Sequence, residues 1–185
     1  ENKHARQKRF DFSQGAHVFV VGKVSRLARQ KGFDLLVPII DAFLKITGAQ
    51  LIVVGMGETE IMTFFRELEE KFPAQVRTHL QFDNDLSHIV FAGADVILMP
   101  SYFEPSGLTQ MEAMRYGTIP VARRVGGLAD TIEDYAPEKG EGSGFLFDEF
   151  DSTSFLIALV RAFSSWRYRD SWTKLQQNAM RKDFS

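Results

Sequence analysis

Two glutamates stand on either side of a turn in the stretch SYFEPSGLTQMEAMRYGTIP, residues 101–120. Glu104 precedes the turn, Gly107 lies in it, and Glu112 follows it. The glycine frees the backbone to begin a helix, whose first N–H groups lack partners within the helix and attract phosphate oxygens. Carboxylates accept hydrogen bonds from pairs of hydroxyls. The stretch therefore predicts a site for a sugar nucleotide. The alternative is a plain loop acid at Glu104 and a surface pair between Glu112 and Arg115.

A basic loop, GKVSRLARQKG, occupies residues 22–32. Gly22 would let a ligand approach the backbone closely. Arg26 and Lys31 can neutralise a diphosphate without a metal, since arginine binds it as a fork and lysine as a point charge. Taken alone, these cations are equally compatible with solvated loop charges. Combined with the acidic turn, they predict a diphosphate site.

A second glycine pair, in VVGMGETE, resembles part of a dinucleotide-binding fingerprint. That fingerprint requires a third glycine, which packs the helix against the strand, but Glu60 stands at that position. Gly55 and Gly57 are therefore interpreted as a tight turn before an acidic helix start.

Other candidate groups carry weaker signals. Phe82 follows a predicted strand, where its ring could stack on a base or belong to the core. No Ser/His/Asp order typical of a catalytic triad is found. The four histidines show no spacing that suggests a metal site: His4, His17, His79 and His88. We therefore expect no metal.

Short apolar, β-branched runs alternate with stretches of helical periodicity, which predicts an α/β fold with a doubly wound, Rossmann-like parallel sheet of about six strands. The predicted strands are 17–21, 50–54, 76–81, 95–99, 118–122 and 144–147. The predicted helices are 33–47, 59–72, 85–92, 107–116, 152–163 and 168–180. Residues 123–143, rich in glycine and charge, are expected to form an irregular surface excursion. Ligands of such sheets bind beyond the carboxyl ends of the strands, where both loops described above should lie.

Composition narrows the possible partners. The chain has 185 residues, 44% of them apolar and 25% charged, with a net charge of −2. Such a balance gives no electrostatic reason to expect nucleic acid or an anionic membrane. There is no cysteine, which excludes disulfides and thiolate metal sites and fits a cytoplasmic location. No apolar run approaches the roughly 20 residues needed to span a bilayer.

The domain organisation is expected to be simple. The length suits a single core, which we assign to residues 17–185. Residues 1–16, with basic side chains between positions 3 and 9, are expected to be a linker or the remnant of a preceding segment. The chain is thus expected to be a piece of a longer protein.

Three longer stretches carry a family resemblance: RLARQKGFDLL, SHIVFAGADVILMPSYFEPSGLTQMEAMRYGTIPVARRVGGLADTI and GSGFLF. They resemble the carboxyl-terminal half of bacterial glycogen synthases and plant-type starch synthases, which are retaining glycosyltransferases of the GT-B fold. The resemblance covers nearly the whole chain. It implies one half of a GT-B fold, holding a nucleotide-sugar donor, usually ADP-glucose. It also implies a cytoplasmic enzyme, or one of the plastid stroma in a plant or alga.

The resemblance also implies roles for individual residues. Arg26 and Lys31 would contact the donor diphosphate and stabilise the leaving ADP without a metal or cofactor, and Glu104 would hold hydroxyls of the transferred glucose. The remaining donor-binding residues implied are Gly22, Phe82 beside the adenine, Ser106, the amides of Gly107, Leu108 and Thr109, and Glu112 at the ribose. The glucose would be added to the non-reducing end of an α-1,4-glucan, with retention of configuration.

The chain departs from the family pattern in three ways. Ser106 stands where these synthases usually carry cysteine. Glu112 follows the broader GT-B pattern, which keeps open a related GT-B enzyme that uses a UDP- or GDP-sugar. The amino-terminal half of the family is absent, and with it most of the expected acceptor site. Outside this family, the residues are also compatible with a nicotinamide-dependent oxidoreductase domain built on Gly55 and Gly57, or with a non-catalytic receiver-like module.

Overall fold

The computed structural model describes residues 17–184 and contains one six-stranded sheet within them. All strand pairs are parallel, and β2 and β4 are buried along their whole length, as expected for a sheet covered on both faces. The predicted basic segment at residues 3–9 and the linker 1–16 lie outside the described residues. The strands are β1 (Val20–Val24), β2 (Gln50–Val54), β3 (Val76–His79), β4 (Val96–Met99), β5 (Ile119–Arg123) and β6 (Phe145–Phe147).

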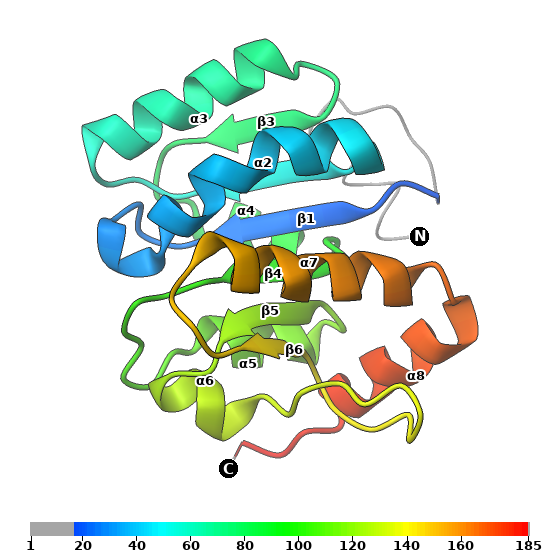
Figure 1. The fold of residues 1–185 in the computed structure, drawn as a ribbon. Coiled ribbons are helices and arrows are strands. Elements are labelled where there is room, and N and C mark those ends of the chain that lie inside the picture. Colours follow the sequence, from blue (N-terminus) through cyan, green and yellow to red (C-terminus); the bar gives the residue numbers. More distant parts are fainter. Residues whose placement is uncertain (1–16, 185) are drawn as a thin grey trace.

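The strand order is β3-β2-β1-β4-β5-β6, the doubly wound arrangement that the sequence predicts. Helices α2 and α7 pack together on one face, and α4 and α5 lie on the other (Figure 1). None of the described helices is long and apolar enough to cross a membrane. The helical segments are η1 (Arg29–Lys31), α2 (Phe33–Thr47), α3 (Thr59–Lys71), α4 (Asn84–Phe91), α5 (Thr109–Arg115), α6 (Gly126–Thr131), α7 (Ser152–Trp166) and α8 (Arg169–Met180).

Helix α2 shows how the sequence pattern produces this packing. Its buried residues include Phe33, Leu36, Ile40 and Leu44, whose spacing of three and four places them on one helical face. The helix ends at Gly48, which has a φ of 66° and donates its N–H to the carbonyl of Leu44. The buried face packs α2 against the sheet, and the start of the helix follows the basic loop directly.

Strand β1 ends three residues later than predicted, because Gly22, Lys23 and Val24 belong to it. Gly22 and Lys23 pair in register with β2, Gly22 with Ile52 and Lys23 with Val53. A glycine followed by a lysine is typical of a strand end, yet this lysine side chain is buried, with the residue 2% exposed. The basic loop consequently begins at Ser25.

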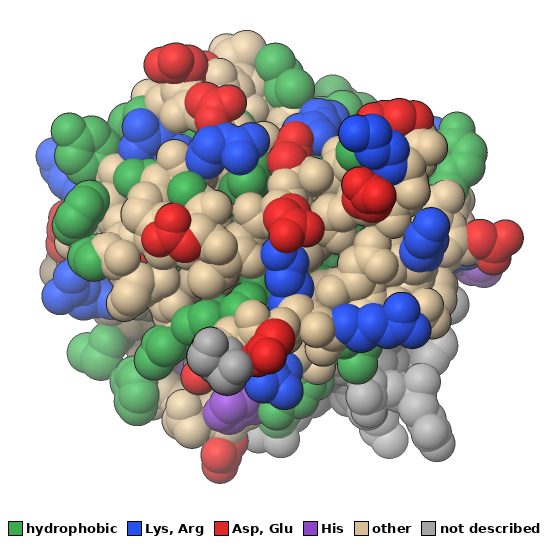
Figure 2. All heavy atoms as spheres, turned by 90° about the horizontal axis from the view of Figure 1, so that it is seen from below, with side chains coloured by type: hydrophobic (Ala, Val, Ile, Leu, Met, Phe, Trp, Pro, Cys, Tyr) green, Lys and Arg blue, Asp and Glu red, His purple; other side chains and the backbone are tan. Residues whose placement is uncertain are grey.

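The region 123–143 was expected to be irregular throughout, but it contains α6. Leu128 and Ile132 are buried against the core, so this part of the segment is not a surface excursion. Two adjacent glycines are weak helix formers, which hides the helix in the sequence. On the outer surface, acidic and basic side chains are interspersed on the face shown in Figure 2, in keeping with the small net charge.

Candidate functional site

The two predicted loops meet where the strand order reverses. β1 and β4 are neighbours in the sheet, and the chain leaves them toward β2 and β5 on opposite sides. Such a switch point leaves a crevice beyond the carboxyl ends of the two strands. The basic loop follows β1 and the loop carrying Glu104 follows β4, so both line this crevice.

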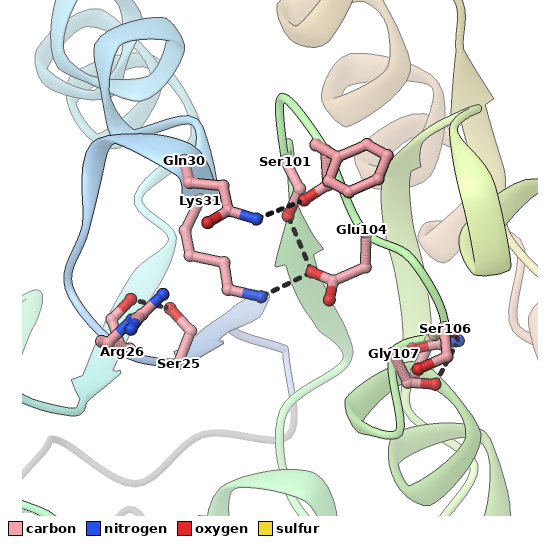
Figure 3. Close-up of polar contacts among 10 residues, drawn as sticks. Ser25, Arg26, Gln30, Lys31, Ser101, Glu104, Ser106 and Gly107 are labelled. Carbon is pink, nitrogen blue, oxygen red and sulfur yellow. Dashed lines mark hydrogen bonds and ion pairs between the residues drawn. The ribbon is translucent and has the colours of Figure 1, made fainter.

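An ion pair joins the two loops at this point (Figure 3). The Lys31 Nζ donates to Glu104 Oε2 at 2.6 Å, and the Ser101 hydroxyl donates to the same oxygen at 3.2 Å. The side chains of Lys31 and Glu104 are only 20% and 10% exposed. A charged pair removed from water in this way holds both loops in one geometry, since separating it would leave an uncompensated buried charge.

Backbone contacts fix the same two loops independently of the ion pair. The Gln30 side-chain amide donates to the Phe103 carbonyl at 3.1 Å, while the Tyr102 N–H donates to the Gln30 carbonyl at 2.9 Å. Gly32 has a φ of 75°, and a Cβ added there would lie 1.8 Å from the Pro100 carbonyl oxygen. Only glycine allows this close approach, so the backbone positions Lys31 in addition to its ion pair.

A cavity of about 510 Å³ opens at the same ends of the strands, although neither Lys31 nor Glu104 lines it. Four predicted residues from three different parts of the chain line it: Arg26, Phe82, and Thr109 and Glu112 of α5. The ring of Phe82 is 83% exposed, which excludes the core role left open for it. Among residues 17–184, no acidic side chain forms an ion pair with Arg26, whose guanidinium is exposed at the cavity. The cavity thus combines an exposed ring, an acid and a cation that has no acidic partner among the described residues.

The turn before α5 has the predicted glycine, but the helix starts later than expected. Gly107 has a φ of 66° and Leu108 is the N-cap residue, so α5 begins at Thr109 rather than at Gly107. Gln110, which the sequence did not single out, is fully buried and donates to the carbonyls of Ser106 and Gly107. This side chain holds the turn in shape. Ser106, Gly107 and Leu108 flank the cavity-lining Thr109 without lining the cavity themselves.

Helix α6 supports the turn from behind, and sequence reasoning missed it. The Gly127 N–H donates to the Glu104 carbonyl at 3.0 Å. A Cβ added at Gly127 would lie 1.8 Å from the Ser106 carbonyl oxygen, and one at Gly126 would lie 2.1 Å from that of Glu104. The adjacent glycines are the signal in the sequence, since they permit two backbone segments to touch.

Three other glycines have packing roles. Gly22 was predicted to follow β1 and face a ligand, but it lies within β1, where an added Cβ would be 2.8 Å from the Val90 Cγ1 of α4. Gly55 and Gly57 lie against the basic loop: an added Cβ would be 1.9 Å from the Ser25 carbonyl oxygen and 2.1 Å from that of Leu27. The glycine pair therefore serves packing against the basic loop, where Gly57 forms a parallel bridge with Leu27.

No group of three or more His, Asp or Glu side chains within the described part of the chain is arranged to hold a metal ion. The cations at the site are Arg26 and Lys31, in addition to Lys23 beneath them. Any charge on a bound diphosphate would therefore meet these side chains.

Comparison with known proteins identifies the family. A model of the family described as glycosyl transferases group 1 matches residues 6–179. Glycogen synthase from Gloeobacter violaceus is 44% identical over 185 residues, covering 100% of this chain and 40% of its own length. Glycogen synthase 1 from Synechocystis is also 44% identical, with 39% of its length covered. The chain thus spans about two fifths of the length of these relatives.

Solved structures agree in fold. The catalytic domain of starch synthase IV from Arabidopsis thaliana, bound to ADP and acarbose, superposes with a TM-score of 0.91 and 37% identity, covering 100% of this chain and 39% of that one. Sucrose-phosphate synthase from Thermosynechococcus elongatus gives a TM-score of 0.69 and 26% identity, with 94% of this chain and 43% of that one covered. The chain belongs to the glycosyl transferases group 1 family and forms one Rossmann-like half of a GT-B fold.

Proposed function

We propose that this chain is the donor-binding half of an α-1,4-glucan synthase that transfers glucose from ADP-glucose to the non-reducing end of a glucan with retention of configuration. The observation that carries the proposal is that the Lys31–Glu104 pair and the cavity lined by Arg26 and Phe82 both lie beyond the carboxyl ends of the strands around the β1/β4 switch point. The relatives named glycogen synthase, and the starch synthase bound to ADP, favour this reaction over other sugar transfers.

Each group at the site has a proposed part in donor binding. Arg26 and Lys31 bind the diphosphate and stabilise the charge that develops on the leaving ADP, a metal-free electrostatic role. The amides of Gly107, Leu108 and Thr109 reach phosphate oxygens. Phe82 stacks on the base, Glu112 accepts from the ribose and Glu104 from hydroxyls of the glucose. The glucan is bound by the other half of the enzyme, and a cytoplasmic location stays a prediction.

In this scheme the diphosphate competes with Glu104 for Lys31. In the structure the Lys31 ammonium donates to the Glu104 carboxylate. A diphosphate beside Lys31 must draw the ammonium away from the carboxylate or share it. Because both side chains are largely buried, this exchange is energetically significant and ties diphosphate binding to glucose binding.

Titration of the chain with ADP, ADP-glucose, UDP-glucose and NAD in the absence of metal tests the proposal. We expect ADP and ADP-glucose to bind best. Arg26→Ala and Lys31→Ala should each weaken the binding of ADP by roughly 1.5–3 kcal/mol, because each removes a charge-assisted hydrogen bond. Glu104→Ala should weaken ADP-glucose more than ADP. Arg66→Ala, at an exposed position on α3, is the control. Wild-type ADP affinity in both basic variants would refute the assignment, and preferential binding of NAD would favour an oxidoreductase domain instead.

Phe82→Ala is expected to weaken ADP while leaving the free energy of unfolding nearly unchanged. The ring is 83% exposed and therefore contributes little to the core, yet it lines the cavity. Stacking of a base on an aromatic ring contributes about 1–3 kcal/mol. Calorimetric titration with ADP and urea unfolding provide the two readouts. Tyr168→Ala removes another ring, 70% exposed and remote from the cavity lining, and should change neither. Unchanged ADP affinity in Phe82→Ala would mean that the base lies elsewhere.

A further inference from the structure

A lysine lies buried in the sheet directly below the site. Lys23, the fourth of the five residues of β1, is 2% exposed. Because side chains alternate along a strand, Gly22 faces α4 and Lys23 faces the opposite side, where its Nζ lies 5.2 Å from the centroid of the Phe33 ring. Phe33 is the first residue of α2, two residues after Lys31. The amine therefore lies under the start of α2, close to the ion pair of the site.

The surroundings of Lys23 disfavour its charged form. Burial, and to a smaller extent repulsion from Lys31, lower the pKa of Lys23 from 10.5 to about 7, while attraction to Glu104 acts in the opposite direction. Within the described residues, these two side chains are the charged groups that act on the amine. From α2, Asp34 interacts with Arg29 instead. The neighbour on β2, Val53, is apolar, as are the β4 residues.

The Lys31–Glu104 ion pair suggests a role for the Lys23 amine. If Lys31 turns to a diphosphate, the Glu104 carboxylate loses the ammonium that lies 2.6 Å from it in the structure. Glu104 is 8% exposed, so water cannot fully replace that partner. A buried carboxylate without a compensating charge is strongly unfavourable. Lys23 is the other cation that acts on Glu104, and it can compensate the carboxylate only if it carries a proton.

We propose that Lys23 is a positioning residue of the donor site, which takes up a proton from solvent when a nucleoside diphosphate binds and compensates Glu104 while Lys31 holds the phosphates. This inference rests on the proposed function. The negative diphosphate reinforces the effect, since a nearby anion favours the charged form of an amine. Binding and protonation are then linked, so that each favours the other.

Calorimetric titration with ADP at about pH 8, in buffers of different ionisation enthalpy, measures the protons taken up. At that pH the terminal phosphate of ADP is already ionised, because the second pKa of a phosphate ester is about 6. We expect wild type to take up close to one proton per ADP, and its affinity to fall by up to about tenfold per pH unit above pH 8. Lys23→Met should show no uptake and a flat affinity profile, and Lys23→Leu serves if the methionine variant does not fold.

Lys45→Met is the matched control, because it removes an exposed lysine of α2 that is remote from the site. It should retain the wild-type uptake. Binding of ADP by wild type without proton uptake would overturn this proposal and leave the proposed function standing. Undiminished uptake in Lys23→Met would overturn it as well. Failure of wild type to bind ADP at all would instead overturn the proposed function, and this inference with it.

Discussion

Gly127→Ala is expected to abolish ADP binding although residue 127 touches no ligand. The added Cβ would lie 1.8 Å from the carbonyl oxygen and 2.4 Å from the carbonyl carbon of Ser106. These are backbone atoms, so relief requires α6 and the loop of residues 104–107 to separate. Glu104 belongs to that loop, and its bonds to Lys31 and Ser101 would be strained or lost. Overpacking of this kind costs typically about 1–3 kcal/mol.

The measurement combines urea unfolding with ADP titration, and Gly48→Ala is the matched control. Gly48 has a φ of 66° at the end of α2, with no atom within 4 Å of an added Cβ. Alanine there meets backbone strain without a collision, which costs on the order of 1 kcal/mol. Both variants should be less stable than wild type, but only Gly127→Ala should fail to bind ADP. If Gly127→Ala bound ADP as wild type does, α6 would not hold the loop in the way that the contact indicates.

The contact between Gly127 and the Ser106 carbonyl shows which features can be predicted from the sequence and which cannot. Apolar runs such as 50–54 and 96–99 are buried on both faces, so their identity as strands follows from composition alone. The neighbours of Gly126 and Gly127 lie more than 20 residues away in the chain, at the loop of residues 104–106. Local periodicity contains no information about such a neighbour. A glycine pair could therefore be noticed in the sequence, but its partner could not be named.

Lys23 was expected to lie beyond the end of β1, but it lies within the strand. A charged residue after a glycine predicts the end of a strand, because lysine is rarely buried without a partner. Here the amine lies 5.2 Å from the centroid of the Phe33 ring and is attracted by the charge of Glu104, surroundings that only the folded chain creates. Arg26, Lys31 and Glu104 could be singled out as candidates because they follow the ends of strands, and their contact with a donor stays a prediction. The pair between Lys31 and Glu104 could not be predicted, since each was expected to contact a ligand.

Burial of the Lys23 amine should lower the unfolding free energy of the chain in a pH-dependent way. Lys23→Met should remove this destabilisation. The pKa of Lys23 is about 7 in the folded chain and 10.5 as its ordinary value. Between these values the unfolded chain carries a proton that the folded chain lacks, so the unfolding free energy of wild type rises with pH. Below about pH 7 both states are protonated, and the folded state bears the full cost of the buried charge.

Lys23→Met should therefore be more stable than wild type by the largest margin below about pH 7, where the margin amounts to several kcal/mol. The margin should shrink by as much as about 1.4 kcal/mol per pH unit as the pH rises toward 10.5. Urea unfolding at about pH 6 and about pH 9 measures both points. Lys45→Met should show no comparable change, because solvent reaches that ammonium in both states. A margin that is the same at both pH values would show that the Lys23 amine keeps its proton on folding. The charge would then be present beneath Lys31 and Glu104 before any diphosphate arrives.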